Sequence, residues 1–299
     1  MAHMTTTSRP ATPFDTLRSL ARTHLSPQDA ERWTGLLRPG VRLRRAEADE
    51  PVVGQLGGLP RLPEDVAWPV WEEERCALSF VAMLDCAALR AVAAAQGCEL
   101  PLATDGRLAF FTGFDEEEGR VVDAGDRDTW AGARVLHLPP EEPSALERPA
   151  PEDVEPYAVV PLTAVTVPSI PGSDSPASAS AFGFARWQDQ YQHPATSGPF
   201  SQALEPHEQH NGHQALGHPQ SIQGAVEVEV AQGVLGGRLR RDDPQIVAEA
   251  ARWTLLAQFD SDGDAGMSWG DCGVLYWLIR SEHLAANRFD QALLTMQCC

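Results

Sequence analysis

The chain has 299 residues, of which 43% are hydrophobic and 22% charged, and 42 acidic against 23 basic residues give a formal net charge of −19. This length favours one large domain or two closely packed halves, and the hydrophobic fraction excludes a globally disordered chain. The negative charge argues against a binder of nucleic acid or of an anionic membrane surface, because both repel a negative field. A basic run, Arg238–Arg241, is followed directly by Asp242 and Asp243.

The sequence also predicts a compartment. No stretch of about 18 apolar residues occurs, so we expect no membrane-spanning helix, and the N-terminus lacks the basic-then-apolar order of a secretory signal. Six cysteines without a CxxC pair are too sparse for a disulfide framework, so free thiols in a reducing cytoplasm are expected. The adjacent Cys298 and Cys299 leave open a redox-active or metal-binding pair.

Hydrophobic periodicity and turn residues predict the secondary structure along the chain. Two short helices are expected over 14–38, the second capped by Ser26 with Pro27 at its first position. Further helices are predicted over 85–96, with Asp85 as the cap, over 184–191 and 244–251, and from 281 onwards. Strands are predicted over 41–46, 78–84, 107–112, near 121 and 135, and over 157–167, 226–230, 253–259, 274–279 and 292–297. In this set the alternating run VEVEV at 226–230 indicates a half-exposed strand.

This order of elements predicts an α+β fold that is mainly β, built of short strands with peripheral helices. Residues 1–49 are expected to form an N-terminal helical extension, in which 1–3 are a cloning remnant, and 50–299 to form the main domain. Two Pro-rich inserts are predicted at 139–156 and 168–182, the first solvated and extended and the second mobile.

Two pairs of segments suggest an internal duplication. Residues 78–85 (LSFVAMLD) resemble 253–260 (WTLLAQFD), and 106–112 (GRLAFFT) resemble 273–279 (GVLYWLI). A true duplication predicts two related halves that share one core, whereas the alternative is a chance likeness between buried strands.

An acidic loop follows the strand predicted over 253–259. Asp260, Asp262 and Asp264 alternate there, with Gly263 and Gly266 between and after them. Alternate carboxylates in a turning loop are ligands for a hard divalent cation such as Ca²⁺. The EF-hand pattern fails, because Gly is not at the sixth position and no Glu is at the twelfth. The alternative is a tight turn between two buried strands.

The turn Trp269–Gly273 (WGDCG) offers a second candidate. Cys272 could act as a nucleophile, but the adjacent Asp271 would raise rather than lower the pKa of a thiol. The alternative is a small residue in a tight turn. Trp269 either plugs the core or lines a shallow binding cleft.

A histidine-rich segment over 207–218 is the third candidate. Imidazole is a common zinc ligand, but Gly and Pro residues in the segment argue against a regular helix, so a flexible polar loop is the alternative. His213 and Gln214, with Gln220–Gln223, could equally form a hydrogen-bonding rim for a polar ligand.

Five ordered motifs carry a resemblance. The first runs from GGLPRLP at 57–63 to Trp68–Pro69, and the second and third are residues 78–85 and 106–111. The fourth is HQALGHPQSIQ at 213–223, and the fifth is residues 255–279, which include the WGDCG turn. Over about residues 50–299 the chain resembles the YwqG-like bacterial proteins, a family of unknown function. The resemblance implies a roll-like, mainly β fold, a cytoplasmic location and no catalytic residues to carry over. It implies that the family pattern includes His213, Gly217, Pro219, Gln223, Asp260, Asp262, Trp269, Gly270 and Asp271.

Two hypotheses follow. The first is a ligand-binding or protein-interaction module, with no nucleic-acid or membrane partner, whose candidate binding residues are His213, Gln214, Gln223, Trp269, Asp271 and Cys272. The alternative is a metal-dependent, hydrolase-like enzyme in which His213 and a divalent ion such as calcium, held by Asp260, Asp262 and Asp264, carry the chemistry.

Overall fold

The computed structural model describes residues 11–115, 118–140, 146–208 and 212–298, and its main element is a ten-stranded antiparallel sheet. The strands run in the order β12-β11-β10-β9-β1-β8-β2-β5-β6-β7. Their bounds are β1 Arg38–Arg45, β2 Gly54–Leu56, β5 Ser79–Asp85, β6 Arg107–Thr112, β7 Ala133–Leu138, β8 Val160–Ser169, β9 Gln214–Ala215, β10 Trp253–Asp260, β11 Val274–Arg280 and β12 Leu293–Gln297. A separate hairpin pairs β3 Val70–Trp71 with β4 Cys76–Ala77.

The sheet curls until its two halves face each other. Phe110 of β6 lies 5.1 Å from Phe259 of β10 and 5.3 Å from Trp277 of β11, measured between ring centroids. These rings belong to one buried cluster that draws residues from both ends of the sheet. The mainly β prediction is confirmed, because the continuous apolar runs of β5 and β11 are buried on both faces.

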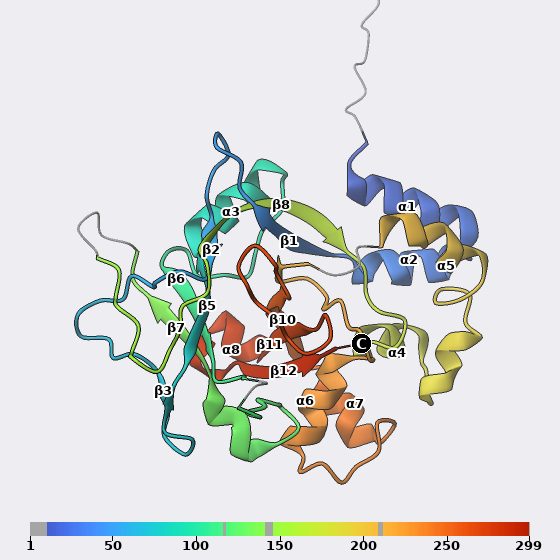
Figure 1. Cartoon of the computed structure of the whole chain (residues 1–299). Coiled ribbons are helices and arrows are strands. Elements are labelled where there is room, and N and C mark those ends of the chain that lie inside the picture. Colours follow the sequence, from blue (N-terminus) through green and yellow to red (C-terminus); the bar gives the residue numbers. More distant parts are fainter. Residues whose placement is uncertain (1–10, 116–117, 141–145, 209–211, 299) are drawn as a thin grey trace, which may run out of the picture.

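Helices surround the sheet (Figure 1). The α-helices are α1 Pro13–His24, α2 Pro27–Leu36, α3 Cys86–Ala95, α4 Pro176–Phe182, α5 Pro199–Leu204, α6 Val226–Val234, α7 Pro244–Ala250 and α8 Ser281–Ala285. Short 3₁₀ helices are η1 Arg127–Gly132, η2 Trp187–Tyr191, η3 Glu205–His207 and η4 Phe289–Gln291. The predicted caps form: Ser26 Oγ accepts the Asp29 N–H, and Asp85 accepts the Ala88 N–H.

Helices α1, α2, α4 and α5 pack together as a helical lobe with its own buried cluster (Figure 1). Trp33 of α2 meets Phe200 of α5 edge to face, with ring centroids 4.9 Å apart. The residues before 50 therefore share packing with a helix 160 positions later, and β1 lies inside the sheet between β8 and β9.

Three local predictions are wrong. Residues 226–230 form the first part of α6 instead of a strand, because Val226 and Val230 pack on the sheet while Val228 packs towards α7. The helix thus has two buried sides, one against the sheet and one against α7, and together they produced the alternating pattern of valines. The strand near Val121 is absent, and the helix over 184–191 is reduced to η2.

The Pro-rich segments are anchored. Residues 168–182 complete β8 and form α4, and Ser169, Ser175 and Ser178 are buried, so the expectation of a mobile insert is wrong. In the described part of 139–156, Arg148 donates its backbone N–H to the Pro60 carbonyl at 2.8 Å.

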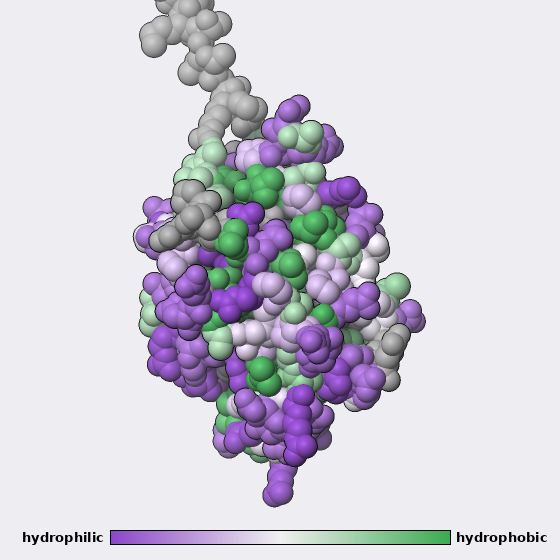
Figure 2. All heavy atoms as spheres, turned by 60° about the vertical axis from the view of Figure 1, so that its left-hand side comes forward, coloured by the Kyte–Doolittle hydropathy of each residue, from purple (hydrophilic) through white to green (hydrophobic). Residues whose placement is uncertain are grey.

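One side of the surface mixes apolar and polar side chains. Figure 2 shows hydrophobic side chains scattered among hydrophilic ones on the side that it presents. Among the described helices, none is long and apolar enough to cross a membrane.

Candidate functional site

His213 lies against the start of the acidic loop and is 8% exposed. Its Nε2 is 3.1 Å from Asp262 Oδ2, and its Nδ1 accepts the backbone N–H of Asp260 at 3.1 Å. An N–H donor at Nδ1 places the ring proton on Nε2, which therefore donates to the carboxylate. Both ring nitrogens are occupied, so His213 could bind a metal ion only by giving up one of these bonds.

The three aspartates predicted to hold a metal ion have separate partners. Asp260 Oδ2 accepts the Gly212 N–H at 2.8 Å, Asp262 Oδ1 accepts the Ala265 N–H at 2.8 Å, and Asp264 Oδ2 pairs with Arg45 at 2.7 Å. Within the described ranges, no group of three or more His, Cys, Asp or Glu side chains is arranged to hold a metal ion. The loop closes as a turn, with two backbone hydrogen bonds between residues 262 and 267.

The pKa values of Asp260 and Asp262 reflect both their burial and these hydrogen-bond partners. Burial raises the pKa of Asp260, more than the Gly212 N–H and His213 lower it. Burial also opposes ionisation of Asp262, but hydrogen bonds from Ala265 and His213 outweigh it and lower its pKa.

The remaining candidates do not gather around His213. Trp269 is 1% exposed and packs in the core between Phe114 and Tyr157. Asp271 and Cys272 are exposed on the next turn, where Cys272 has a left-handed backbone with φ of 50°. Gln223 has an exposed side chain and donates its backbone N–H to Gln297.

Gln214 lies beside a cavity. Its buried side chain donates from Nε2 to the carbonyls of Leu216 and His218, at 2.7 and 2.9 Å. Its Oε1 accepts from Gln220 Nε2 at 3.0 Å, and the Gln220 N–H donates to Gln258 Oε1 at 3.0 Å. These bonds hold the loop 214–221 in one conformation at the cavity wall.

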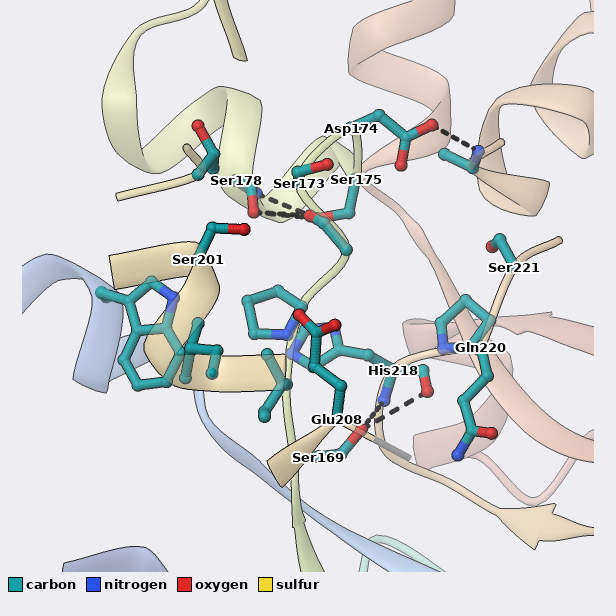
Figure 3. Close-up of a pocket in the computed structure, with 18 of the residues that line it drawn as sticks. Ser169, Ser173, Asp174, Ser175, Ser178, Ser201, Glu208, His218, Gln220 and Ser221 are labelled. Carbon is teal, nitrogen blue, oxygen red and sulfur yellow. Dashed lines mark hydrogen bonds between the residues drawn. The ribbon is translucent and has the colours of Figure 1, made fainter. Parts of the chain in front are cut away.

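The cavity has a volume of about 400 Å³ and lies between the helical lobe, the segment 168–178, the loop 214–221 and the start of α6. We call it the serine cavity, because its lining includes Ser169, Ser173, Ser175, Ser178, Ser201 and Ser221. In Figure 3 the side chains of Ser201 and Glu208 point into the space between Ser178 and His218. Its volume is in the range of small-ligand sites.

Two buried acceptors on this lining have no hydrogen-bond partner, Glu227 Oε2 and Gln220 Oε1. Glu227 is only 5% exposed. Burial raises its pKa to about 7, Asp174 and Glu229 add to this effect, and Arg38 opposes it. Buried acceptors without donors are rare and costly in native structures, so these two atoms require an explanation.

His218 also lines the cavity and is uncharged at neutral pH. Its Nε2 is 2.8 Å from the Leu36 carbonyl at the end of α2, so this nitrogen carries the ring proton. Burial lowers its pKa to about 4, and the nearby Arg38 acts in the same direction. His218 therefore joins the helical lobe to the loop 214–221 and brings no positive charge to the cavity.

A second cavity of about 450 Å³ adjoins the first and shares Ser173, Asp174 and Ser221 with it. We call it the aromatic cleft, since Trp187 and Tyr191 line it and are 51% and 64% exposed. Gln223, a predicted ligand-binding residue, lies on its wall.

Sequence reasoning missed Glu227 and the serines of 168–178. Glu227 lies between two valines in the run that was interpreted as a strand with its glutamates in solvent. Val226 and Val230 are four residues apart, which also fits one side of a helix that packs on the sheet. A helix over these residues would have placed Glu227 at a buried face.

The model of a protein family described as "Domain of unknown function (DUF1963)" matches residues 54–298, so the chain belongs to this family. No curated protein matches the chain. The prediction of a domain of unknown function over most of the chain is thereby confirmed.

Proposed function

We propose that this member of the DUF1963 family binds a small polar molecule in the serine cavity. The observation that carries the proposal is the carboxyl group of Glu227: this residue is on the cavity lining, and its buried Oε2 has no hydrogen-bond partner. This keeps the ligand-binding hypothesis but moves the site from the acidic loop to the cavity. Of the predicted binding residues, Gln214 lines it.

The energetic cost of Glu227 supports a functional role. A pKa of about 7 in place of 4.5 means that ionisation of this group destabilises the folded state. At about 1.36 kcal/mol per pKa unit, the penalty at pH 8 is roughly 3 kcal/mol, a large share of a typical folding free energy. Perturbed groups in cavities concentrate at functional sites, because selection for stability alone would replace them.

We also infer an internal duplication that relates the two ends of the sheet. From the central β1–β8 pair the order runs β2-β5-β6-β7 in one direction and β9-β10-β11-β12 in the other. Each half has an irregular register at the same place, between Phe80 and Ala82 in β5 and between Leu255 and Ala257 in β10. These positions coincide when 78–85 is aligned with 253–260.

The turns that follow β2 and β9 support the same inference. Gln55 and Gln214 each donate from Nε2 to the carbonyl two residues later, at 2.8 and 2.7 Å. The duplication aligns Leu59 with His218 and Met83 with Gln258. The second half therefore carries polar, buried side chains where the first has apolar ones, and these polar side chains adjoin the serine cavity.

The finer expectations stay proposals. We retain the relationship to YwqG-like bacterial proteins, the roll-like description of the sheet and a cytoplasmic location on the sequence motifs described above. His213 and the three aspartates of the acidic loop each have partners within the protein, which disfavours a metal-dependent hydrolase at this loop.

The proposal is tested by filling the cavity. Ser201 on α5 lines it, so Ser201→Phe should occupy part of its volume, whereas Gln202→Phe adds the same ring at an exposed neighbouring position. Thermal unfolding is followed with a panel of polyols, amides, amines and amino acids. A ligand at a hundredfold excess over its Kd stabilises by about 2.7 kcal/mol, which raises Tm by a few degrees.

We expect at least one compound to stabilise the unsubstituted protein and Gln202→Phe, but not Ser201→Phe. The proposal is wrong if no compound acts, or if Ser201→Phe responds as strongly as the unsubstituted protein.

A further inference from the structure

We infer that the ligand of the serine cavity carries a positively charged nitrogen group, an organic ammonium or guanidinium, that donates hydrogen bonds to Glu227 and Gln220. This inference rests on the proposed function and adds the chemical class of the ligand.

The charges on the lining support a cationic ligand. Asp174, Glu208 and Glu227 line the cavity, and no Arg is among its described lining residues. The chain contains no lysine, so no lysine ammonium group of its own can reach the site. Three carboxyl groups around one cavity repel anions and attract cations.

Hydrogen-bond capacity points to donors on the ligand. Glu227 Oε2 and Gln220 Oε1 are acceptors without partners. Asp174 Oδ2 accepts the Ala225 N–H at 2.9 Å and lies 3.9 Å from Arg241, so it is partly occupied. An ammonium or guanidinium group brings several N–H donors to one place, and such charge-assisted bonds to a carboxylate are the stronger kind.

A neutral ligand or a metal ion fits these acceptors less well. A hydroxyl group could donate to Glu227 but would leave its negative charge uncompensated in a buried site. A hard metal ion requires six or more oxygen ligands, and the described residues hold no group of three or more His, Cys, Asp or Glu side chains that could bind one. The serine hydroxyls can accept the remaining N–H groups of an organic cation.

The surroundings of Glu227 define a proton-linked signature. Asp174 and Glu229 disfavour its ionised form and Arg38 favours it, and the balance with burial places its pKa at about 7. A bound cation favours the carboxylate, so binding near pH 7 should release up to about half a proton per site. A neutral ligand that accepts from the protonated acid would instead cause proton uptake.

The test compares two probes of matched length, 1,4-diaminobutane, which carries two ammonium groups, and the uncharged 1,4-butanediol. Agmatine and methylammonium extend the cation series. Isothermal titration of the full chain at pH 7 and low salt, in two buffers of different ionisation enthalpy, reports affinity and proton release together. Glu227→Gln removes the charge with little change in shape, and Glu205→Gln removes an exposed charge from η3 as the matched control.

We expect the diamine to bind with proton release, the diol not to bind, and Glu227→Gln to weaken diamine binding at least tenfold while Glu205→Gln leaves it unchanged. Should Glu227→Gln fail to fold, Glu227→Asp serves instead. It keeps the charge at a shorter reach, so it should bind more weakly and still release protons.

Three results would overturn the inference. If uncharged compounds bind in a way that Ser201→Phe abolishes while no cation does, the proposed binding function stands and the cationic ligand is wrong. If neither cations nor uncharged compounds bind, the inference and the proposed function both fail. Diamine binding that Glu227→Gln leaves intact also overturns it, because the cation then binds elsewhere.

Discussion

The substitution Glu227→Gln tests whether the buried carboxyl group of Glu227 on α6 destabilises the protein without a ligand. In the unfolded chain this group titrates near its ordinary value of 4.5, and in the folded chain burial raises the pKa to about 7. Below about pH 4.5 it is protonated in both states, so ionisation imposes no penalty. As the pH rises through this window the unfolded state loses its proton first, and stability falls until about pH 7.

The size of the effect follows from the two pKa values. A difference of about 2.5 units corresponds to roughly 3 kcal/mol, an upper figure because water and Arg38 can relax towards the charge. Glutamine does not titrate. The free energy of unfolding of Glu227→Gln minus that of the unsubstituted protein should therefore rise by about 3 kcal/mol between pH 4 and pH 8.

Urea unfolding at pH 4, 5, 6, 7 and 8, followed by tryptophan fluorescence, measures this difference. Glu205→Gln, at an exposed site, should show no such trend. A difference that is constant with pH would mean that Glu227 is solvated or paired in solution, and the reasoning from its burial would be refuted.

Two further predictions concern buried polar contacts away from the cavity. His213→Ala should lower the free energy of unfolding by about 2–3 kcal/mol, because it leaves the Asp260 N–H and the Asp262 carboxylate without their partner. It should not change binding in the serine cavity, and a loss of binding without a loss of stability would return the site to the acidic loop. Glu249→Gln should destabilise by about 2–3 kcal/mol at pH 7, since Glu249 accepts from Trp253 Nε1 at 2.9 Å and from Arg280 Nη2 at 2.6 Å. Burial opposes ionisation of Glu249, but these hydrogen bonds outweigh it and lower its pKa. The stabilisation is therefore present at neutral pH and is lost as the pH falls through that pKa. In urea unfolding at pH 3, the difference between Glu249→Gln and the unsubstituted protein should be smaller than at pH 7.

Local signals predicted much of the secondary structure. The apolar runs at 78–84 and 253–259 form β5 and β10, and Ser26 and Asp85 cap the helices that their positions suggested. These features depend on residues close in the sequence. Helix α6 was mispredicted because its valines contact two different elements, the sheet and α7, which a single-period pattern cannot represent.

The candidate site depended on contacts that the sequence does not contain locally. Gln214 was identified from its polar surroundings, whereas the burial of Glu227 arises only when α6 packs beside segments more than 50 residues away, including Asp174. The aspartates of the acidic loop looked like a metal site because alternation was visible, but their partners Gly212 and Arg45 come from distant parts of the chain.

The helical lobe has a consequence for how selectivity can vary. Trp33 of α2 forms part of the cavity wall, yet it lies before residue 54, where the match to the family begins. The opposite wall, with Gln214, Gln220 and Glu227, lies within the matched region. A change at Trp33 can therefore retune the size of the proposed ligand while the acceptors that anchor its charged end stay the same. The cavity thus joins one wall that lies outside the family match to another that lies within it.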